Sequence, residues 1–239
     1  MDTRLREIIE EAHRIVFFGG AGVSTESGIP DFRSAAGLYN RSSGTRYAPE
    51  QILSRSFFDT HPEEFFDYYR AHLVHTEARP NPAHIALANL ERAGKLSAVI
   101  TQNIDGLHQV AGSRRVLELH GSIHRNHCLG CGRSYPLAEV LAQPGVPRCL
   151  DCGAVIKPDV VLYEEALDPA VIEASISELA AADVLIVGGT SLQVYPAAGL
   201  VRAFGGRELV LINRDATDYD ALATLTIREP IGQALGWLA

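Results

Sequence analysis

Residues 14–28 read RIVFFGGAGVSTESG, an apolar run that passes directly into a glycine-rich turn. The run Arg14–Phe18 is β-branched and aromatic, which favours a buried strand. Gly20 and Gly22 would let the backbone approach a phosphate, and a helix starting after the turn would add unpaired N–H groups. The stretch therefore indicates the first strand and phosphate-binding turn of a parallel α/β fold, although the glycine pair alone also suits a plain turn.

Strand-like and helix-like segments continue to alternate along the chain. Apolar residues at three- and four-residue spacing predict helices over Pro82–Ala93 and Asp168–Ala181, and the N-terminal residues predict a short amphipathic helix. Further strands are expected at Ala98–Thr101, Val116–Leu119, Val160–Tyr163, Val184–Val187 and Leu209–Ile212. The fold class is therefore α/β, with a Rossmann-type parallel sheet flanked by helices.

Two stretches interrupt this alternation. Residues 35–79 are polar, then aromatic and helix-prone, and residues 122–156 hold the cysteines and several turn residues. We expect them to form a small domain, a helical insertion plus a zinc module. The Rossmann-type nucleotide-binding domain then comprises residues 1–34, 80–121 and 157–239.

Composition and charge narrow the classes of function. The net charge of −8 argues against broad capture of nucleic acid, which needs clustered Lys and Arg, while it suits cationic partners. No apolar run reaches the roughly 18 residues of a membrane span. The first residues also lack the apolar core of a signal peptide, so we expect a cytoplasmic location.

All four cysteines lie in two CxxC pairs, Cys128 with Cys131 and Cys149 with Cys152. Two such knuckles offer four thiolates to one tetrahedral zinc ion. Two separate redox dithiols would not explain why the pairs come as a matched set. Four thiolates leave no open position for water or substrate, so the predicted zinc is structural.

The glycine turn departs from that of an ordinary dinucleotide dehydrogenase. Thr25 stands where the simplest motif has its third glycine. A dehydrogenase also carries an acidic residue about 20 positions further on, which binds the ribose. No acidic residue occurs from Phe32 to Pro49, which disfavours a zinc-containing dehydrogenase.

The segment GAGVSTESGIPDFRS, residues 20–34, resembles the signature of the sirtuin family of NAD-dependent protein deacylases. The resemblance recurs in order along nearly the whole chain, in TQNIDGLH (Thr101–His108), His120-Gly121, the two CxxC pairs, KPDVV (Lys157–Val161), GTSL (Gly189–Leu192) and Ile212-Asn213. The chain is similar to the short bacterial members of the sirtuin family. This similarity implies that the Rossmann-type domain binds NAD beside a zinc-and-helix small domain.

The resemblance implies an NAD-dependent protein-lysine deacetylase, or deacylase, that consumes NAD. Loss of nicotinamide would let the acyl-lysine oxygen attack C1′ of the ribose and form an alkylimidate. Attack by the 2′-hydroxyl would then lead to lysine and O-acyl-ADP-ribose. Acylated lysine-containing proteins or peptides are the expected partners, with neither nucleic acid nor a membrane. The alternatives are a mono-ADP-ribosyltransferase using the same site and a non-catalytic NAD sensor.

His120 is the expected catalytic base, assisted by Asn103. It follows a strand and precedes a glycine, at the edge where open α/β sheets collect ligands, and a pKa of about 6.5 suits a base near neutral pH. His108 is expected to pack rather than react. By resemblance, the residues that contact NAD are Gly20, Ala21, Gly22, Thr25, Asp31, Phe32, Arg33, Gln102, Asn103, Ile104, Asp105, His120, Gly189, Thr190, Ser191, Asn213 and Arg214.

The residues expected to bind the acylated peptide are Val161, Leu162, Tyr163, Val194, Phe66 and Tyr69. The peptide would lie extended as an added strand. Phe66 and Tyr69 take the places where relatives that favour acidic acyl groups carry Tyr and Arg, so acetyl or longer aliphatic groups are expected. These two aromatics are equally compatible with a simple core role. Glu164 stands where many relatives have glycine, which leaves the shape of the peptide groove open.

Overall fold

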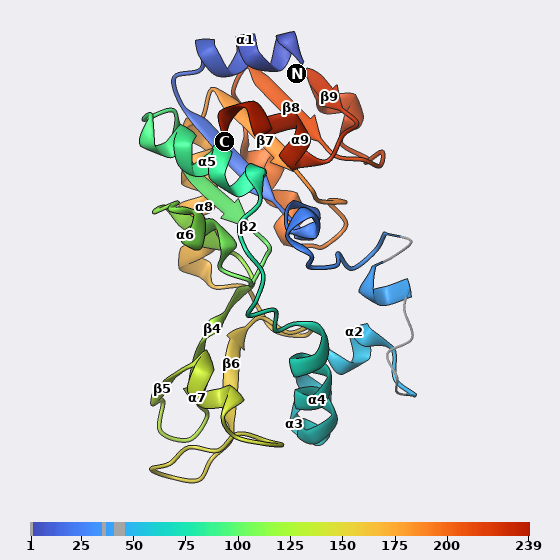
Figure 1. Cartoon of the computed structure of the whole chain (residues 1–239), viewed down its shortest axis with the longest axis vertical. Helices are drawn as coiled ribbons and strands as arrows, with labels where there is room; N and C mark the ends of the chain where they lie inside the picture. Colours follow the sequence, from blue (N-terminus) through green and yellow to red (C-terminus); the bar gives the residue numbers. More distant parts are fainter. Residues whose placement is uncertain (1, 35–36, 41–45) are drawn as a thin grey trace.

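The computed structural model describes residues 2–34, 37–40 and 46–239. Figure 1 shows two lobes, an upper one built on a large sheet and a lower one that holds a small sheet beside a group of helices. The large sheet has six parallel strands in the order β3-β2-β1-β7-β8-β9. Their bounds are β1 (Ile15–Gly19), β2 (Leu96–Thr101), β3 (Val116–Glu118), β7 (Val184–Gly188), β8 (Glu208–Ile212) and β9 (Leu225–Ile227).

Every residue of β1 and β7 is buried, because helices cover both faces of the sheet. Ile15 and Phe17 of β1 join one apolar cluster, while Val16 and Phe18 join the other. The first face is covered by α1 (Thr3–Glu11), α5 (Pro82–Arg92) and α9 (Ile231–Leu235), and the second by α8 (Pro169–Ala181) and the 3-10 helix η4 (Ala197–Ala203). The predicted Rossmann-type class is confirmed.

The lower lobe joins a three-stranded antiparallel sheet to a helical group. The sheet runs in the order β5-β4-β6, with β4 (Gly121–Cys128), β5 (Ser134–Pro136) and β6 (Ile156–Val160). The helices are α2 (Pro49–Ile52), α3 (Arg55–Thr60), α4 (Pro62–His72) and α7 (Leu137–Leu141). Aromatic side chains from α3 and α4 fill the core between them.

The last elements are short. They are α6 (Leu107–Ala111) and the 3-10 helices η1 (Ala21–Val23), η2 (Thr25–Ser27), η3 (Leu38–Asn40), η5 (Asp220–Leu222) and η6 (Gly236–Leu238). Across the described part of the chain, no helix combines the length and apolar character that a membrane crossing requires.

The structure corrects one predicted strand. Of the segment expected at Val160–Tyr163 as part of the parallel sheet, only Val160 lies in a strand, as the last residue of β6, which pairs antiparallel with β4 in the small sheet. The proposed domain boundaries, at residues 34/35, 79/80, 121/122 and 156/157, remain predictions, and residues 35 and 36 lie outside the described residues.

Candidate active site and zinc centre

A cleft of about 500 Å³ lies at the carboxyl ends of the parallel strands and reaches the small domain. All of the predicted NAD-contacting residues line it, and so do four of the predicted peptide-contacting residues, Val161, Leu162, Tyr163 and Val194. Segments far apart in the sequence thus meet in one cavity. Their roles toward NAD and peptide remain predictions.

Phe66 and Tyr69 are the two exceptions. Both side chains are fully buried and do not line the cleft. They pack edge-on against each other, and Phe65 packs edge-on against Phe66 and stacks on Tyr69, inside the aromatic core of the lower lobe. Their alternative interpretation as core residues fits the structure, because the helical spacing that points them at a ligand points them equally well at a core. The cleft is lined instead by His72, Leu73 and His75, at and just beyond the end of α4.

The glycine turn packs against the end of β7. A Cβ on Gly22 would lie 2.8 Å from the Gly189 Cα, and a Cβ on Gly20 would lie 2.8 Å from the Thr190 Cβ. Glycine is required at both positions because any side chain would push these two loops apart. The α-helix expected after the turn is absent, since η1 and η2 are single 3-10 turns. The open cradle of small residues still suits a pyrophosphate.

His120 is half-buried and lines the cleft directly before β4. Its Nδ1 is 3.0 Å from the Gln102 carbonyl oxygen, which can only accept, so Nδ1 carries the hydrogen and Nε2 is left as an acceptor. Burial lowers the pKa of the imidazole, and the hydrogen bond to Gln102 offsets part of this shift. A neutral ring with a free Nε2 is the form that a general base requires.

A polar network beside His120 includes a residue that the sequence prediction missed. The Ser24 hydroxyl donates to the Asp105 carboxylate at 2.7 Å and accepts from the Asn103 amide at 3.1 Å. Ser24 is buried, so its bonds fix both side chains of the loop after β2. Its position directly after the glycine turn was the only available signal, and serine is common in such turns for local reasons.

Three further predicted NAD contacts, Arg214, Asp31 and Arg33, have partners among the residues that line the cleft. Arg214 pairs with Asp31 at 3.6 Å, which links the loop after β8 to the loop after the glycine turn. The Arg33 guanidinium lies 5.3 Å from the centre of the Tyr39 ring. Both cations are at the cleft surface, where they could turn toward a phosphate.

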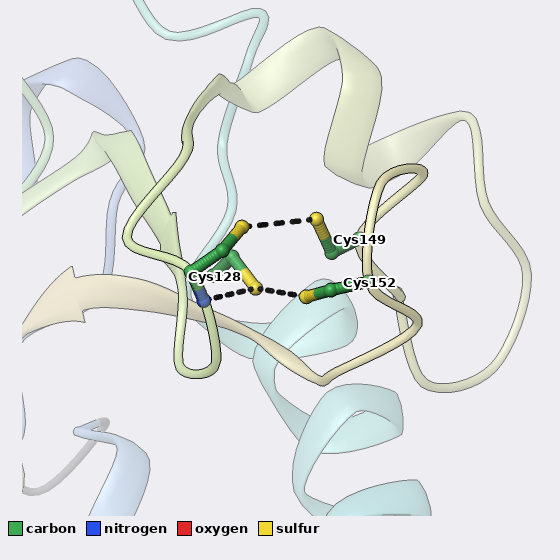
Figure 2. A group of neighbouring side chains, drawn as sticks. Cys128, Cys149 and Cys152 are labelled. Carbon is green, nitrogen blue, oxygen red and sulfur yellow. Dashed lines mark hydrogen bonds between the residues drawn. The ribbon is translucent and has the colours of Figure 1, made fainter.

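The four cysteine sulfurs all lie within 4.8 Å of one another. Figure 2 shows Cys128, at the end of β4, facing Cys149 and Cys152 on the opposite loop. The Sγ atoms of Cys128 and Cys152 are 3.3 Å apart, and the buried Tyr135 hydroxyl donates to Cys149 at 3.1 Å. Four converging thiols with supporting hydrogen bonds are the donor set of a closed zinc site.

The fold and the cleft define a class, a Rossmann-type nucleotide-binding protein that presents a neutral histidine at its strand edge and carries a four-cysteine metal module. Within that class the chain belongs to the Sir2 family, whose family model matches residues 20–196.

Relatives and solved structures agree along nearly the full length. The chain is 57% identical to an NAD-dependent protein deacetylase of Clostridium perfringens, over 98% of this chain and 96% of the relative. It is 58% identical to a protein of the same name from Cutibacterium acnes, over 97% and 95%. Sir2 bound to an acetylated peptide is 36% identical with a TM-score of 0.86, covering 98% and 96%. Sir2 in complex with the inhibitor EX-527, 2'-O-acetyl-ADP-ribose and deacetylated p53-peptide gives the same values.

Proposed function

We propose that this chain is an NAD-dependent protein-lysine deacetylase that transfers the acyl group from lysine to ADP-ribose and releases nicotinamide. The observation that carries the proposal is the position of His120, which lines the cleft where the glycine turn, the Asn103–Asp105 loop and the segment after β6 meet, with its Nδ1 bonded to the Gln102 carbonyl and its Nε2 left as the acceptor. The names of the relatives and the acetylated peptide and 2'-O-acetyl-ADP-ribose held by the Sir2 structures support it.

NAD supplies the ribose carbon that becomes electron-poor when nicotinamide leaves. His120 accepts a proton at Nε2 from a ribose hydroxyl, and the Gln102 carbonyl keeps its ring oriented. Asn103 and Asp105, held by Ser24, provide an amide and a carboxylate for the ribose and the nicotinamide carboxamide. Gly20 and Gly22 leave room for the pyrophosphate.

The zinc ion has a structural role. Cys128, Cys131, Cys149 and Cys152 would hold the ion with four thiolates and leave no position open for substrate, and none of the four lines the cleft. We also assign the protein to the cytoplasm, because zinc-binding thiols must stay reduced.

Incubating an acetyl-lysine peptide with the purified chain, with and without NAD, tests the proposal by mass spectrometry. We expect loss of the acetyl group only with NAD, and one nicotinamide and one O-acetyl-ADP-ribose for each lysine released. The alternative, a mono-ADP-ribosyltransferase, would instead add ADP-ribose to an acceptor protein and leave the acetyl group in place. That outcome would contradict the proposal.

The pH profile of the enzyme should reflect the environment of His120. Because burial lowers the pKa of this imidazole below 6.5, the neutral base already predominates at pH 6.5 and is lost only as the pH falls further. We therefore expect kcat/KM for the peptide to level off by neutral pH and to fall with an acid limb whose midpoint is below 6.5. Initial rates at low substrate, between about pH 5 and about pH 8, measure this midpoint. A midpoint above 6.5 would contradict the assignment.

The cleft favours uncharged acyl groups. Arg70, the one Arg or Lys on α4, follows Phe66 and Tyr69, but its guanidinium donates to the carbonyls of Gln143 and Gly145 and does not line the cleft. Leu53, Leu73 and Leu162 contribute apolar lining. Burying a carboxylate without a partner is costly, so we expect kcat/KM for acetyl-lysine to exceed that for succinyl-lysine at least tenfold, about 1.4 kcal/mol. Parallel assays on one peptide sequence check this, and equal values would be inconsistent with it.

A further inference from the structure

Lys157 is a buried lysine beneath the segment that follows β6. Its side chain is near the end of that strand and its residue is only 4% exposed. The ammonium donates to the Val160 carbonyl at 2.8 Å and to the Pro158 carbonyl at 3.3 Å, and it pairs with the Glu165 carboxylate at 3.0 Å. One cation thus contacts the chain just before and at the end of Val161–Glu165, which we call the substrate loop.

Glu165 at the end of the substrate loop bonds back to the residues around it. The carboxylate oxygen that pairs with Lys157 also accepts from the Leu162 N–H at 2.8 Å, and its other oxygen accepts from Arg55 at 3.1 Å. Burial alone would raise the pKa of Glu165, but the Leu162 N–H and the Lys157 ammonium outweigh it, so the pKa is lowered. The ion pair therefore holds the middle of the substrate loop through its backbone.

The same loop contacts the catalytic residue and the helical group. The Val161 N–H donates to the His120 carbonyl at 3.0 Å, and the Tyr163 N–H donates to the Leu53 carbonyl at 2.9 Å. Glu164, between Tyr163 and Glu165, has a φ of 76°, which is unfavourable for a residue with a side chain. Such a conformation persists only where its surroundings hold it. The Glu164 carboxylate accepts from the N–H and the hydroxyl of Ser56, at 2.9 and 3.0 Å, and the next residue, Glu165, is held by its bonds to Lys157 and Leu162.

We propose that Lys157 is a positioning residue for peptide binding, because its ammonium and Glu165 fix the substrate loop in the shape that accepts the acyl-lysine backbone. The inference rests on the proposed function. A buried ion pair contributes little net stability compared with apolar packing, so its value here lies in specifying one loop geometry. Main-chain recognition of an extended peptide depends directly on that geometry.

Replacing Lys157 by methionine tests the proposal, because methionine fills a similar length without the ammonium. We expect the KM for an acetyl-lysine peptide to rise by about tenfold, while kcat and the Kd for ADP-ribose stay nearly unchanged. A raised KM with an unchanged kcat indicates that peptide binding is weakened and the chemical step is not. Glu165→Gln, which keeps an acceptor for Leu162 but removes the charge, should raise the peptide KM in the same direction. If Lys157→Met does not fold, Glu165→Gln tests the proposal in its place.

Lys95, the other lysine of the chain, offers a matched control. Its ammonium also bonds to three main-chain carbonyls, those of Ile9, Glu10 and Ala12, and it does not line the cleft. Lys95→Met should lower Tm without changing the peptide KM.

Three outcomes would overturn the inference. The first is a peptide KM that stays at the wild-type value in both Lys157→Met and Glu165→Gln. The second is an equal rise in Lys95→Met, which would reduce the effect to lost stability. The third is an inactive wild type, which would contradict the proposed function itself. Measuring wild-type turnover first separates this last case from the other two.

Discussion

Replacing His120 by alanine is expected to lower turnover of an acetyl-lysine peptide by about 10²- to 10⁴-fold, the usual contribution of a general base. Nε2 is the free acceptor of the ring, because the Gln102 carbonyl takes the hydrogen on Nδ1. Water cannot replace it efficiently in a half-buried position. Steady-state kinetics with saturating NAD measure the loss.

Folding should survive this change, because the His120 backbone carbonyl that accepts from the Val161 N–H is retained in alanine. Zinc content and the Kd for ADP-ribose are therefore expected to match the wild type. His13→Ala is a suitable control, since this histidine is exposed and does not line the cleft. Turnover by His120→Ala close to that of the wild type would refute the assignment of the base.

Removing one zinc ligand, by Cys149→Ala, is expected to abolish zinc binding and unfold the zinc module. The apolar cluster there comprises only a few side chains, Cys128, Tyr135, Val140, Cys149 and Ile156, too few to stabilise the fold without metal. The apparent free energy of binding a structural zinc ion is about 10–16 kcal/mol, and this energy stabilises the folded form of the module. Metal analysis and thermal unfolding measure the effect.

Activity should fall when the metal is lost, because β4 and β6 hold the residues around the reaction site. β4 begins at Gly121, next to His120, and β6 leads into the substrate loop. A strong chelator should reproduce the effect in the wild type, and added zinc should restore it. Ser134→Ala, an exposed position on the neighbouring β5, is expected to keep its zinc. Full zinc content in Cys149→Ala, or a Tm that does not respond to chelation, would show that the four thiols do not form one site.

Much of the fold could be predicted because local chemistry determined it. The apolar run at Arg14–Phe18 must be buried on both faces, which requires helices on each side. The CxxC pairs must converge to serve one ion. His120 stood out because a strand end and a following glycine place it at the ligand-binding edge of the sheet, and the resemblance supplied the residues around the cleft.

The errors arose where the outcome depends on distant partners. The apolar segment Val160–Tyr163 has the composition of a core strand, but only Val160 lies in a strand, β6, whose partner is the distant β4 of the small sheet. The short edge strand β9 carried no run long enough to detect. Phe66 and Tyr69 lie on the helix face that turns to the core, which periodicity alone cannot distinguish from a face that lines a cleft. Ser24 gained its importance only from contacts with Asn103 and Asp105.

The most direct test of the central claim follows the amide oxygen of the substrate. An acetyl-lysine peptide with heavy oxygen in its acetyl carbonyl is incubated with the enzyme and NAD, and the products are separated by mass spectrometry. Attack by this oxygen on the ribose beside His120 predicts that the label is carried into O-acetyl-ADP-ribose. Label recovered in free acetate without release of nicotinamide would mean simple hydrolysis of the amide and would contradict the proposed chemistry.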